Sequence, residues 1–193
     1  MKLNLPNLLI IFRILLIPVF LVFYMATGPY DHAQRIVATL IFLTAALTDL
    51  LDGYLARKWN TVSNFGKLMD PLADKMLVSA GLVALAFRQE LAAWVVILII
   101  SREFWVTSLR MLALEQGKTV IAASLWGKIK TVTQITMLSV IMGGISLLSF
   151  VGLDRFAAWL SPWFIPLLVY TSVAATLFSA AEYTYSYRDV FKV

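Results

Sequence analysis

The sequence contains no cysteine and a single histidine, His32, among its 193 residues. The lack of cysteine excludes disulfides, thiolate nucleophiles and cysteine-ligated zinc, and one histidine excludes a metal site built from several histidines. Charged residues are also scarce, at 14% of the chain. Any metal ion that this protein binds must therefore be held by oxygen atoms.

Hydrophobic residues are abundant instead. They make up 61% of the chain, whereas soluble domains contain about 45–50%. A helix of about 20 apolar residues crosses a bilayer, and the sequence lacks the alternation of apolar and polar residues that is typical of a membrane barrel. The sequence predicts an all-α integral membrane protein, a six-transmembrane-helix bundle forming one domain over residues 1–193. The predicted spans are 7–27, 34–56, 68–87, 91–114, 129–150 and 162–186.

The distribution of lysine and arginine predicts the orientation of these spans. Only three of the sixteen basic residues lie in the connections 28–35, 87–91 and 150–160, which would share one side of the membrane. Because basic residues favour the cytoplasmic side, both termini are predicted to be cytoplasmic. The N-terminal segment lacks the arginine- and serine-rich composition of a transit peptide, which favours a multi-pass protein of the bacterial inner membrane.

Four aspartates lie at the cytoplasmic ends of the second and third predicted spans: Asp49, Asp52, Asp70 and Asp74. A carboxylate at such a depth is costly, so its default interpretation is functional. The spacing within each pair puts both members on one helical face. With no neutralising partner expected nearby, the four carboxylates would repel one another strongly. We therefore expect two Mg²⁺ ions, with Mn²⁺ able to substitute, as a clamp for displacement at phosphorus.

Small residues share the faces of these aspartates. Gly53, Ala56 and Gly66 would allow a pyrophosphate to approach the backbone closely, and Arg57 could pair with a phosphate oxygen. Helix packing through small residues is the alternative explanation, and it is favoured for each residue taken singly. The combination with four aspartates in register favours a pyrophosphate site.

These residues together form the pattern Asp49-x2-Asp52-Gly53-x2-Ala56-Arg57-x8-Gly66-x3-Asp70-x3-Asp74. The pattern resembles the complete signature of the CDP-alcohol phosphotransferase family. The resemblance implies two metal ions on the four aspartates, a homodimer, and Asp74 as the base that accepts the proton of the acceptor hydroxyl. It also implies a site for the CDP-linked donor, formed by Asp49, Gly53, Ala56, Arg57 and Gly66.

Basic residues of the segment 102–134 exceed what topology alone requires. Arg102 and Arg110 lie eight residues apart, within about 80° on a helix, so both can turn inward to a phosphorylated acceptor. Lys128 and Lys130 would add point charges. Attraction to anionic lipid is the alternative, and it is equally supported for Lys118.

Residues of this segment and of the N-terminal region carry a second resemblance. The residues that carry it are Ser101 to Phe104, Leu109, Arg110, Gly127 to Thr131, Gln134, Leu5 to Leu9, Phe12 and Arg13. They resemble the branch of the family that uses CDP-diacylglycerol and sn-glycerol 3-phosphate, releases CMP and serves phosphatidylglycerol and cardiolipin biosynthesis. The expected partners are these substrates and the bilayer, with the active site facing the cytoplasm and no nucleic acid involved.

Two other functions stay open. One is a family member that makes cardiolipin, phosphatidylinositol phosphate or phosphatidylserine, because the aspartate pattern does not specify the acceptor. The other is a divalent-cation transporter, since carboxylates within spans can line an ion path. The transporter is disfavoured because the aspartates lie at one membrane end and the sequence shows no internal repeat.

Four further polar residues lie within apolar runs. Arg13 follows Asn7 by six residues, and it either extends to the interface or faces a polar cavity. The cavity is favoured, with Asn7 as a second member. Glu103 is expected to orient Arg102 or to pair locally rather than act as a base, and Glu182 has no assignable role.

Overall fold

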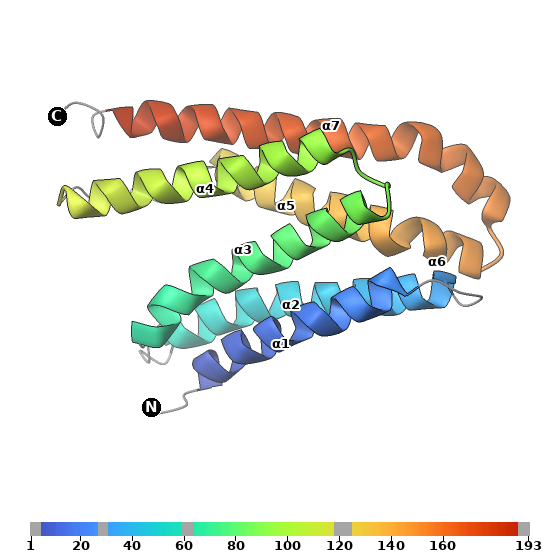
Figure 1. Cartoon of the computed structure of the whole chain (residues 1–193), viewed down its shortest axis with the longest axis horizontal. Coiled ribbons are helices and arrows are strands. Elements are labelled where there is room, and N and C mark those ends of the chain that lie inside the picture. The colour runs from blue at the N-terminus through green and yellow to red at the C-terminus, as the bar shows by residue number, and fades with distance from the viewer. Residues whose placement is uncertain (1–4, 27–30, 59–63, 118–124, 189–193) are drawn as a thin grey trace. The chain divides into compact units, whose positions relative to one another are not determined.

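The computed structural model describes residues 5–26, 31–58, 64–117 and 125–188, without the side chains of residues 5, 6, 50–58, 64–68, 70 and 71. In this part of the chain every regular element is a helix (Figure 1). The elements are α1 (Leu5–Met25), α2 (Asp31–Lys58), α3 (Asn64–Phe87), α4 (Ala93–Glu115), α5 (Leu125–Ser139), η1 (Val140–Gly144), α6 (Ile145–Phe150) and α7 (Asp154–Ser186).

Each predicted apolar run coincides with helix, so the all-α prediction is confirmed for the described residues. The fifth run corresponds to α5, η1 and α6, which follow one another without a break; the sequence did not reveal the π-helical turn between them. Within the described residues, three helices are long and apolar enough to cross a membrane: Asn7–Met25, Leu125–Phe150 and Asp154–Ser186. These helices indicate a membrane protein, while six crossings and cytoplasmic termini stay predictions.

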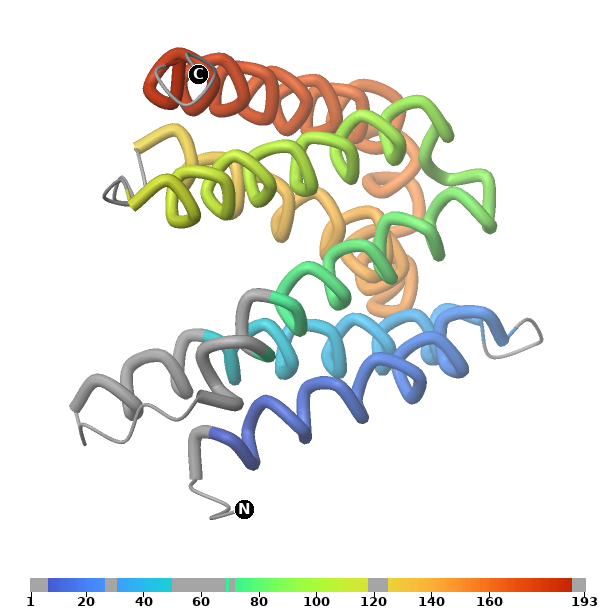
Figure 2. The backbone as a smooth tube through the Cα atoms, turned by 60° about the vertical axis from the view of Figure 1, so that its left-hand side comes forward, coloured from blue at the N-terminus to red at the C-terminus, as the bar shows by residue number. Residues whose placement is uncertain are grey.

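The chain forms two compact units. Unit 1 comprises Met1–Glu90 and Leu138–Trp159. Within it α1 lies along α2 and also contacts α3 (Figures 1 and 2). The fully buried rings of Phe20 and Phe42 meet between α1 and α2, with centroids 5.8 Å apart. Gly143 packs so closely on Thr39 that a Cβ atom at this position would overlap the threonine side chain, which brings η1 against α2.

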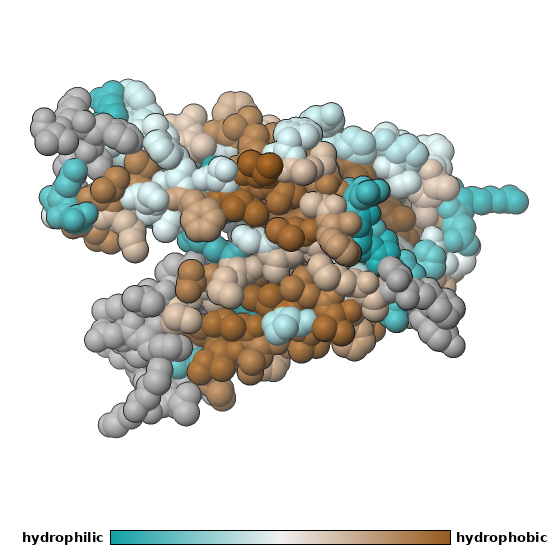
Figure 3. Space-filling view, viewed as in Figure 1, coloured by the Kyte–Doolittle hydropathy of each residue, from teal (hydrophilic) through white to brown (hydrophobic). Residues whose placement is uncertain are grey.

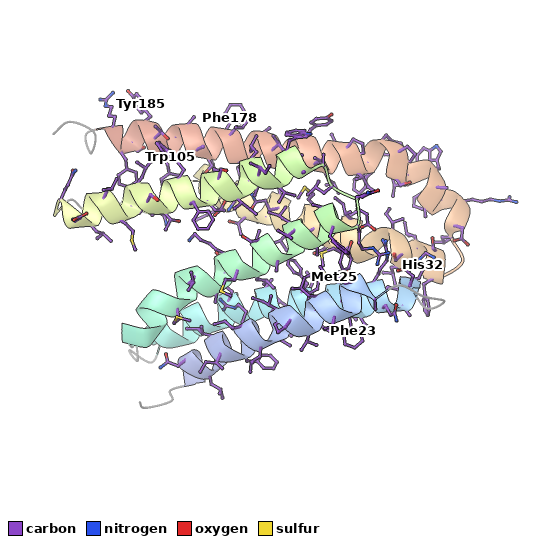
Figure 4. The ribbon with its side chains drawn as sticks, in the orientation of Figure 1. Phe23, Met25, His32, Trp105, Phe178 and Tyr185 are labelled. Atoms are coloured by element: carbon purple, nitrogen blue, oxygen red, sulfur yellow. The ribbon has the colours of Figure 1, made fainter. Side chains whose placement is uncertain are left out.

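The outer face of α1 is apolar. Leu8, Phe12, Leu15, Val22 and Phe23 are all exposed on it, and Figure 3 shows apolar side chains gathered over this part of unit 1. Figure 4 shows Phe23 near the end of α1. A continuous apolar surface of this kind is rare on soluble monomers, because it would favour association. The surface fits contact with lipid.

Unit 2 comprises Leu91–Met137 and Leu160–Val193. Within it α4 and α7 lie side by side (Figures 1 and 2). Their buried contact consists of Val106, Leu109, Ala113, Tyr183 and Tyr187. On the exposed edge of this contact the indole Nε1 of Trp105 donates a hydrogen bond of 2.9 Å to Thr184 (Figure 4). The last part of α7 is thus fixed against α4 by both apolar and polar contacts.

Candidate active site

Two of the four signature aspartates have described side chains. Asp49 lies on α2 and Asp74 lies on α3, and both are half-buried. The two helices contact each other within unit 1. The remaining signature residues belong to the same two helices, but their side chains lie outside the described residues: Asp52, Gly53, Ala56, Arg57, Gly66 and Asp70. The convergence of the four aspartates therefore stays a prediction.

Arg13 pairs directly with the first of these aspartates. Its Nη1 donates a hydrogen bond of 2.6 Å to Asp49 Oδ1, and its Nε lies 3.4 Å from the hydroxyl of Thr48. The Arg13 side chain is fully buried, whereas Asp49 is 34% exposed. The expectation that the carboxylates lack a neutralising partner is therefore wrong for Asp49, because α1 supplies a cation that the sequence separates from it by 36 residues.

The Arg13 side chain thus turns inward, and the polar cavity favoured from the sequence for Arg13 and Asn7 stays a prediction. Asn7, one and a half turns earlier on α1, is also buried, at 3% exposed. A buried arginine is stable only with a hydrogen-bonded anion, since an unpaired charge in such a place costs several kcal/mol. The first helix therefore contributes directly to the aspartate region.

The chemistry of the available donors fits a hard divalent cation. Asp49 and Asp74 offer carboxylate oxygens, and Mg²⁺ prefers such ligands. Among the described side chains, no group of three histidine, cysteine or acidic residues is close enough to hold a metal ion. Two of the four predicted ligands, Asp52 and Asp70, lie outside that set. The two-ion site stays a prediction.

A second polar cluster lies in unit 2 and brings together three of the four predicted acceptor residues. We call it the Tyr183 cluster; its members are Arg102, Glu103, Arg110, Lys130, Ser179 and Tyr183. Glu103 accepts hydrogen bonds from Arg102, at 3.1 Å, and pairs with Lys130 at 2.5 Å. Glu103 therefore pairs locally with Arg102, one of the two roles expected for it, and the orienting role stays a prediction. Two cations, Arg102 and Lys130, thus pair with this carboxylate, and Arg110 adds a third cation to the cluster.

The tyrosine lies beneath both arginines. The guanidinium carbon of Arg102 is 5.8 Å from the ring centroid of Tyr183, and that of Arg110 is 4.9 Å from it. Arg110 Nη2 donates a hydrogen bond of 2.6 Å to the tyrosine hydroxyl, and Arg102 Nη2 donates one to Ser179. The negative ring face attracts each cation. One residue of α7 therefore holds two arginines of α4.

The two predicted lysines differ. Lys130 is 7% exposed and belongs to the cluster, whereas Lys128 is exposed on α5. Residues two apart lie on nearly opposite sides of a helix, so both cannot face the same site. The structure thus brings Lys130, but not Lys128, to Arg102. Lys118 lies outside the described residues.

Sequence reasoning missed the contribution of α7. Four buried hydroxyl residues follow one face of this helix, Ser172, Thr176, Ser179 and Tyr183, and the buried Tyr187 continues the pattern just after the helix ends at Ser186. Their spacing of three or four residues is that of a single helical face. Thr176 accepts a hydrogen bond from Gln134, while Ser179 and Tyr183 accept from the arginines. This hydroxyl face was visible in the sequence as a periodic signal within an apolar run.

A third polar cluster lies at the opposite end of α1 from Asn7. We call it the Tyr24 cluster; its members are Tyr24, Asp31, Arg35, Arg88 and Glu90. Asp31 accepts hydrogen bonds of 2.8 Å from both arginines, and Glu90 accepts one of 2.6 Å from Tyr24 and also pairs with Arg35. Burial alone would raise the pKa of Asp31, but the hydrogen bond and the charges of the arginines outweigh it and lower that pKa. The cluster joins α1 to the start of α2 and the connection after α3.

Helices that carry the aspartates and a separate cationic cluster are features expected of an enzyme that handles phosphate esters. Residues 3–170 match the model of the CDP-alcohol phosphatidyltransferase family, and the chain belongs to this family.

Several curated relatives within this family are similar to most of the chain. The chain is 45% identical over 150 residues to the CDP-diacylglycerol--glycerol-3-phosphate 3-phosphatidyltransferase of Bacillus subtilis (strain 168), covering 72% of this chain and 76% of the relative. It is 43% identical over 143 residues to the protein of the same name from Haemophilus influenzae, covering 72% and 75%. A relative of that name from Rickettsia bellii is 40% identical over 142 residues, covering 73% and 76%.

Proposed function

We propose that this protein transfers the phosphatidyl group of CDP-diacylglycerol to sn-glycerol 3-phosphate and releases CMP. The observation that carries the proposal is the similarity of most of the chain to several curated proteins that share this one name. The complete aspartate pattern supports the reaction. The cationic Tyr183 cluster supports an acceptor that is itself phosphorylated, because serine or another neutral alcohol would not require it.

In the proposed reaction, a hydroxyl oxygen of the acceptor forms a bond to the phosphorus that carries the diacylglycerol. The bond between that phosphorus and the bridging oxygen breaks, and CMP leaves with the electron pair. Asp74 accepts the proton of the attacking hydroxyl, which requires its carboxylate to lie within hydrogen-bond reach of that oxygen. Catalysis at phosphorus depends mainly on positioning and charge stabilisation.

The metal ions belong to this proposal. Asp49, Asp52, Asp70 and Asp74 would hold two Mg²⁺ ions, or Mn²⁺ in their place. When bound, the ions would neutralise the pyrophosphate of the donor and the charge that develops on CMP. Arg13 would fix the Asp49 carboxylate by occupying Oδ1, and Gly53, Ala56, Arg57 and Gly66 would receive the donor.

Arg102, Arg110 and Lys130 would bind the phosphate of the acceptor. Arginine matches the geometry of phosphate oxygens through paired N–H groups, and lysine adds a compact charge. The side chains of all three are held within unit 2 by Glu103, Ser179 and Tyr183. Lys128 would contribute to the positive potential at the mouth of this region.

The membrane arrangement completes the proposal. We expect six spans, cytoplasmic termini, an active site that faces the cytoplasm and a homodimer in the bacterial inner membrane. The diacyl tails of donor and product would stay in the bilayer, which explains why an enzyme for a small soluble acceptor consists largely of apolar helices. The exposed apolar face of α1 supports contact with lipid.

The test is CMP release by the purified protein in detergent with CDP-diacylglycerol and Mg²⁺. Glycerol 3-phosphate, inositol phosphate, serine and phosphatidylglycerol are compared as acceptors. We expect release that depends on glycerol 3-phosphate and stops when EDTA removes the metal. Release with another acceptor would replace the proposed substrate, and nucleotide-independent flux of Mg²⁺ into proteoliposomes, without CMP release, would favour transport.

A further inference from the structure

Two arginines of α4 share one tyrosine of α7, and neither is fully satisfied by it. Arg102 and Arg110 each lie over the ring of Tyr183, at 5.8 Å and 4.9 Å. The buried Nε of each arginine has no hydrogen-bond partner within the described part of the chain. Buried donors are nearly always paired in folded proteins. The two orphaned N–H groups therefore indicate a ligand with several acceptor oxygens.

The positions of the two guanidinium groups depend on Tyr183. Like charges repel, and a ring that attracts both cations offsets the repulsion between two arginines placed over it. The Tyr183 ring supplies its negative face to both, and its hydroxyl accepts from Arg110 at 2.6 Å. The ring itself cannot move freely, because it is 3% exposed and stacks on Tyr187 at a centroid distance of 6.3 Å.

We propose that Tyr183 is a positioning residue that holds Arg102 and Arg110 as one anion site, and that this site takes the phosphate monoester of the acceptor. The inference rests on the proposed function for the identity of that phosphate. The anion site itself rests on the contacts of unit 2. Tyr183 acts through the arginines and does not touch the reacting atoms.

The chain offers graded variants and a matched control. Tyr183→Phe removes the hydroxyl and keeps the ring, whereas Tyr183→Leu removes both. The control is Tyr185→Phe, since Tyr185 lies two residues away on α7 and is 69% exposed (Figure 4). Ser179→Ala removes the hydroxyl that accepts from Arg102 and tests the second arginine separately.

The first readout is the KM for glycerol 3-phosphate against the KM for CDP-diacylglycerol. Loss of one hydrogen bond to a charged group predicts about a tenfold rise in the acceptor KM for Tyr183→Phe. Tyr183→Leu should raise it further, by up to about 100-fold, because the attraction of the ring for both cations is also lost. The donor KM and kcat should stay within about twofold in both variants, and Tyr185→Phe should match the wild type.

The second readout does not depend on turnover. Inorganic phosphate, without donor or metal, should raise the thermal unfolding midpoint of the wild type and of Tyr185→Phe, since a ligand that binds only the folded state stabilises it. The shift should be smaller in Tyr183→Phe and absent in Tyr183→Leu. Equal phosphate shifts in all variants, or proportional changes in both KM values, would overturn the positioning role.

The two readouts separate this inference from the proposed function. If the wild type fails to use glycerol 3-phosphate but its phosphate shift depends on Tyr183, the anion site stands and the proposed acceptor is wrong. If the wild type uses glycerol 3-phosphate and Tyr183→Phe leaves both readouts unchanged, the function stands and the inference is wrong. Tyr183→Phe is nearly isosteric, so a folding failure of Tyr183→Leu leaves this decision intact.

Discussion

The Tyr24 cluster and the Tyr183 cluster share the same central arrangement, but they differ in charge balance and in role. In each, a buried tyrosine lies beneath two arginines, at 5.9 Å and 5.4 Å for Tyr24 and at 5.8 Å and 4.9 Å for Tyr183. Around Tyr24, two carboxylates balance the two arginines, and the tyrosine hydroxyl donates to one of them. Around Tyr183, two cations, Arg102 and Lys130, pair with one carboxylate, and the hydroxyl accepts from the third cation, Arg110.

The difference in charge balance distinguishes a cluster that stabilises the fold from a cluster that can bind a ligand. A balanced cluster has satisfied its own charges and can only hold helices together. A cluster whose buried arginine N–H groups have no hydrogen-bond partner within the described residues retains capacity for an anion, and such unsatisfied groups in folded proteins call for a functional explanation. Variants in the two clusters should therefore affect different measurements: stability for the first, substrate binding for the second.

The largest effect is expected at Asp74, outside both clusters. Asp74→Asn should lower kcat by about 1,000-fold, because an amide cannot accept the proton of the attacking hydroxyl. The unfolding midpoint should stay near the wild-type value, since the amide has the same shape. Steady-state CMP release checks the first expectation and thermal unfolding the second. Asp154→Asn, at an exposed carboxylate at the start of α7, is the control; turnover of Asp74→Asn at the wild-type rate would remove Asp74 from its role.

The pairing of Arg13 with Asp49 should appear as a coupled loss of stability. In EDTA, Arg13→Met should destabilise the protein by about 2 kcal/mol, which is below the range of about 3–5 kcal/mol for a fully buried ion pair because Asp49 is partly exposed. The double variant with Asp49→Asn should lose less than the sum of the single losses. Reversible unfolding in detergent gives the four free energies of this cycle. Strict additivity would show that the contact contributes nothing.

Arg110→Ala tests the cationic side of the comparison. It should raise the KM for glycerol 3-phosphate by about 10- to 100-fold, as expected for lost hydrogen bonds to a charged group, and leave the donor KM unchanged. Arg88→Ala, in the Tyr24 cluster, should do the reverse: it should lower the unfolding midpoint and leave both KM values unchanged. If both variants changed the same measurement, either the KM for glycerol 3-phosphate or the unfolding midpoint, the distinction between the clusters would be wrong.

The sequence predicted the helices because runs of about 20 apolar residues leave few alternatives. It also predicted Arg102, Arg110, Lys128 and Lys130 as a group, and three of these four residues lie together in the Tyr183 cluster, whereas Lys128 is exposed on α5. The π-helical turn at Val140–Gly144 was not predictable, because it depends on the close packing of Gly143 on Thr39. Local periodicity carries no information about such tertiary contacts.

The contacts that the sequence did not predict are mainly those between residues far apart along the chain. Arg13 and Asp49 are 36 residues apart, and Arg102 and Ser179 are 77 apart. Asp31 and Glu90 are likewise far apart in the sequence, and only the fold places them with the same two arginines. Tyr183 carried a weak signal in the hydroxyl face of α7, which an analysis of charge alone overlooks.

The smallest expected effect concerns acid stability at Asp31. Because its pKa is lowered in the folded protein by the hydrogen bond from Arg88 and the charge of Arg35 against the effect of burial, the ionised carboxylate stabilises the fold above its unfolded pKa of about 4. That contribution is lost as the pH falls through the lower folded value.

Asp31→Asn should therefore unfold at a lower temperature than the wild type at pH 7, and the difference should shrink below about pH 4. Thermal unfolding from pH 7 to pH 3 measures this convergence, with CMP release at pH 7 unchanged; parallel curves would mean that Asp31 is not coupled to the arginines.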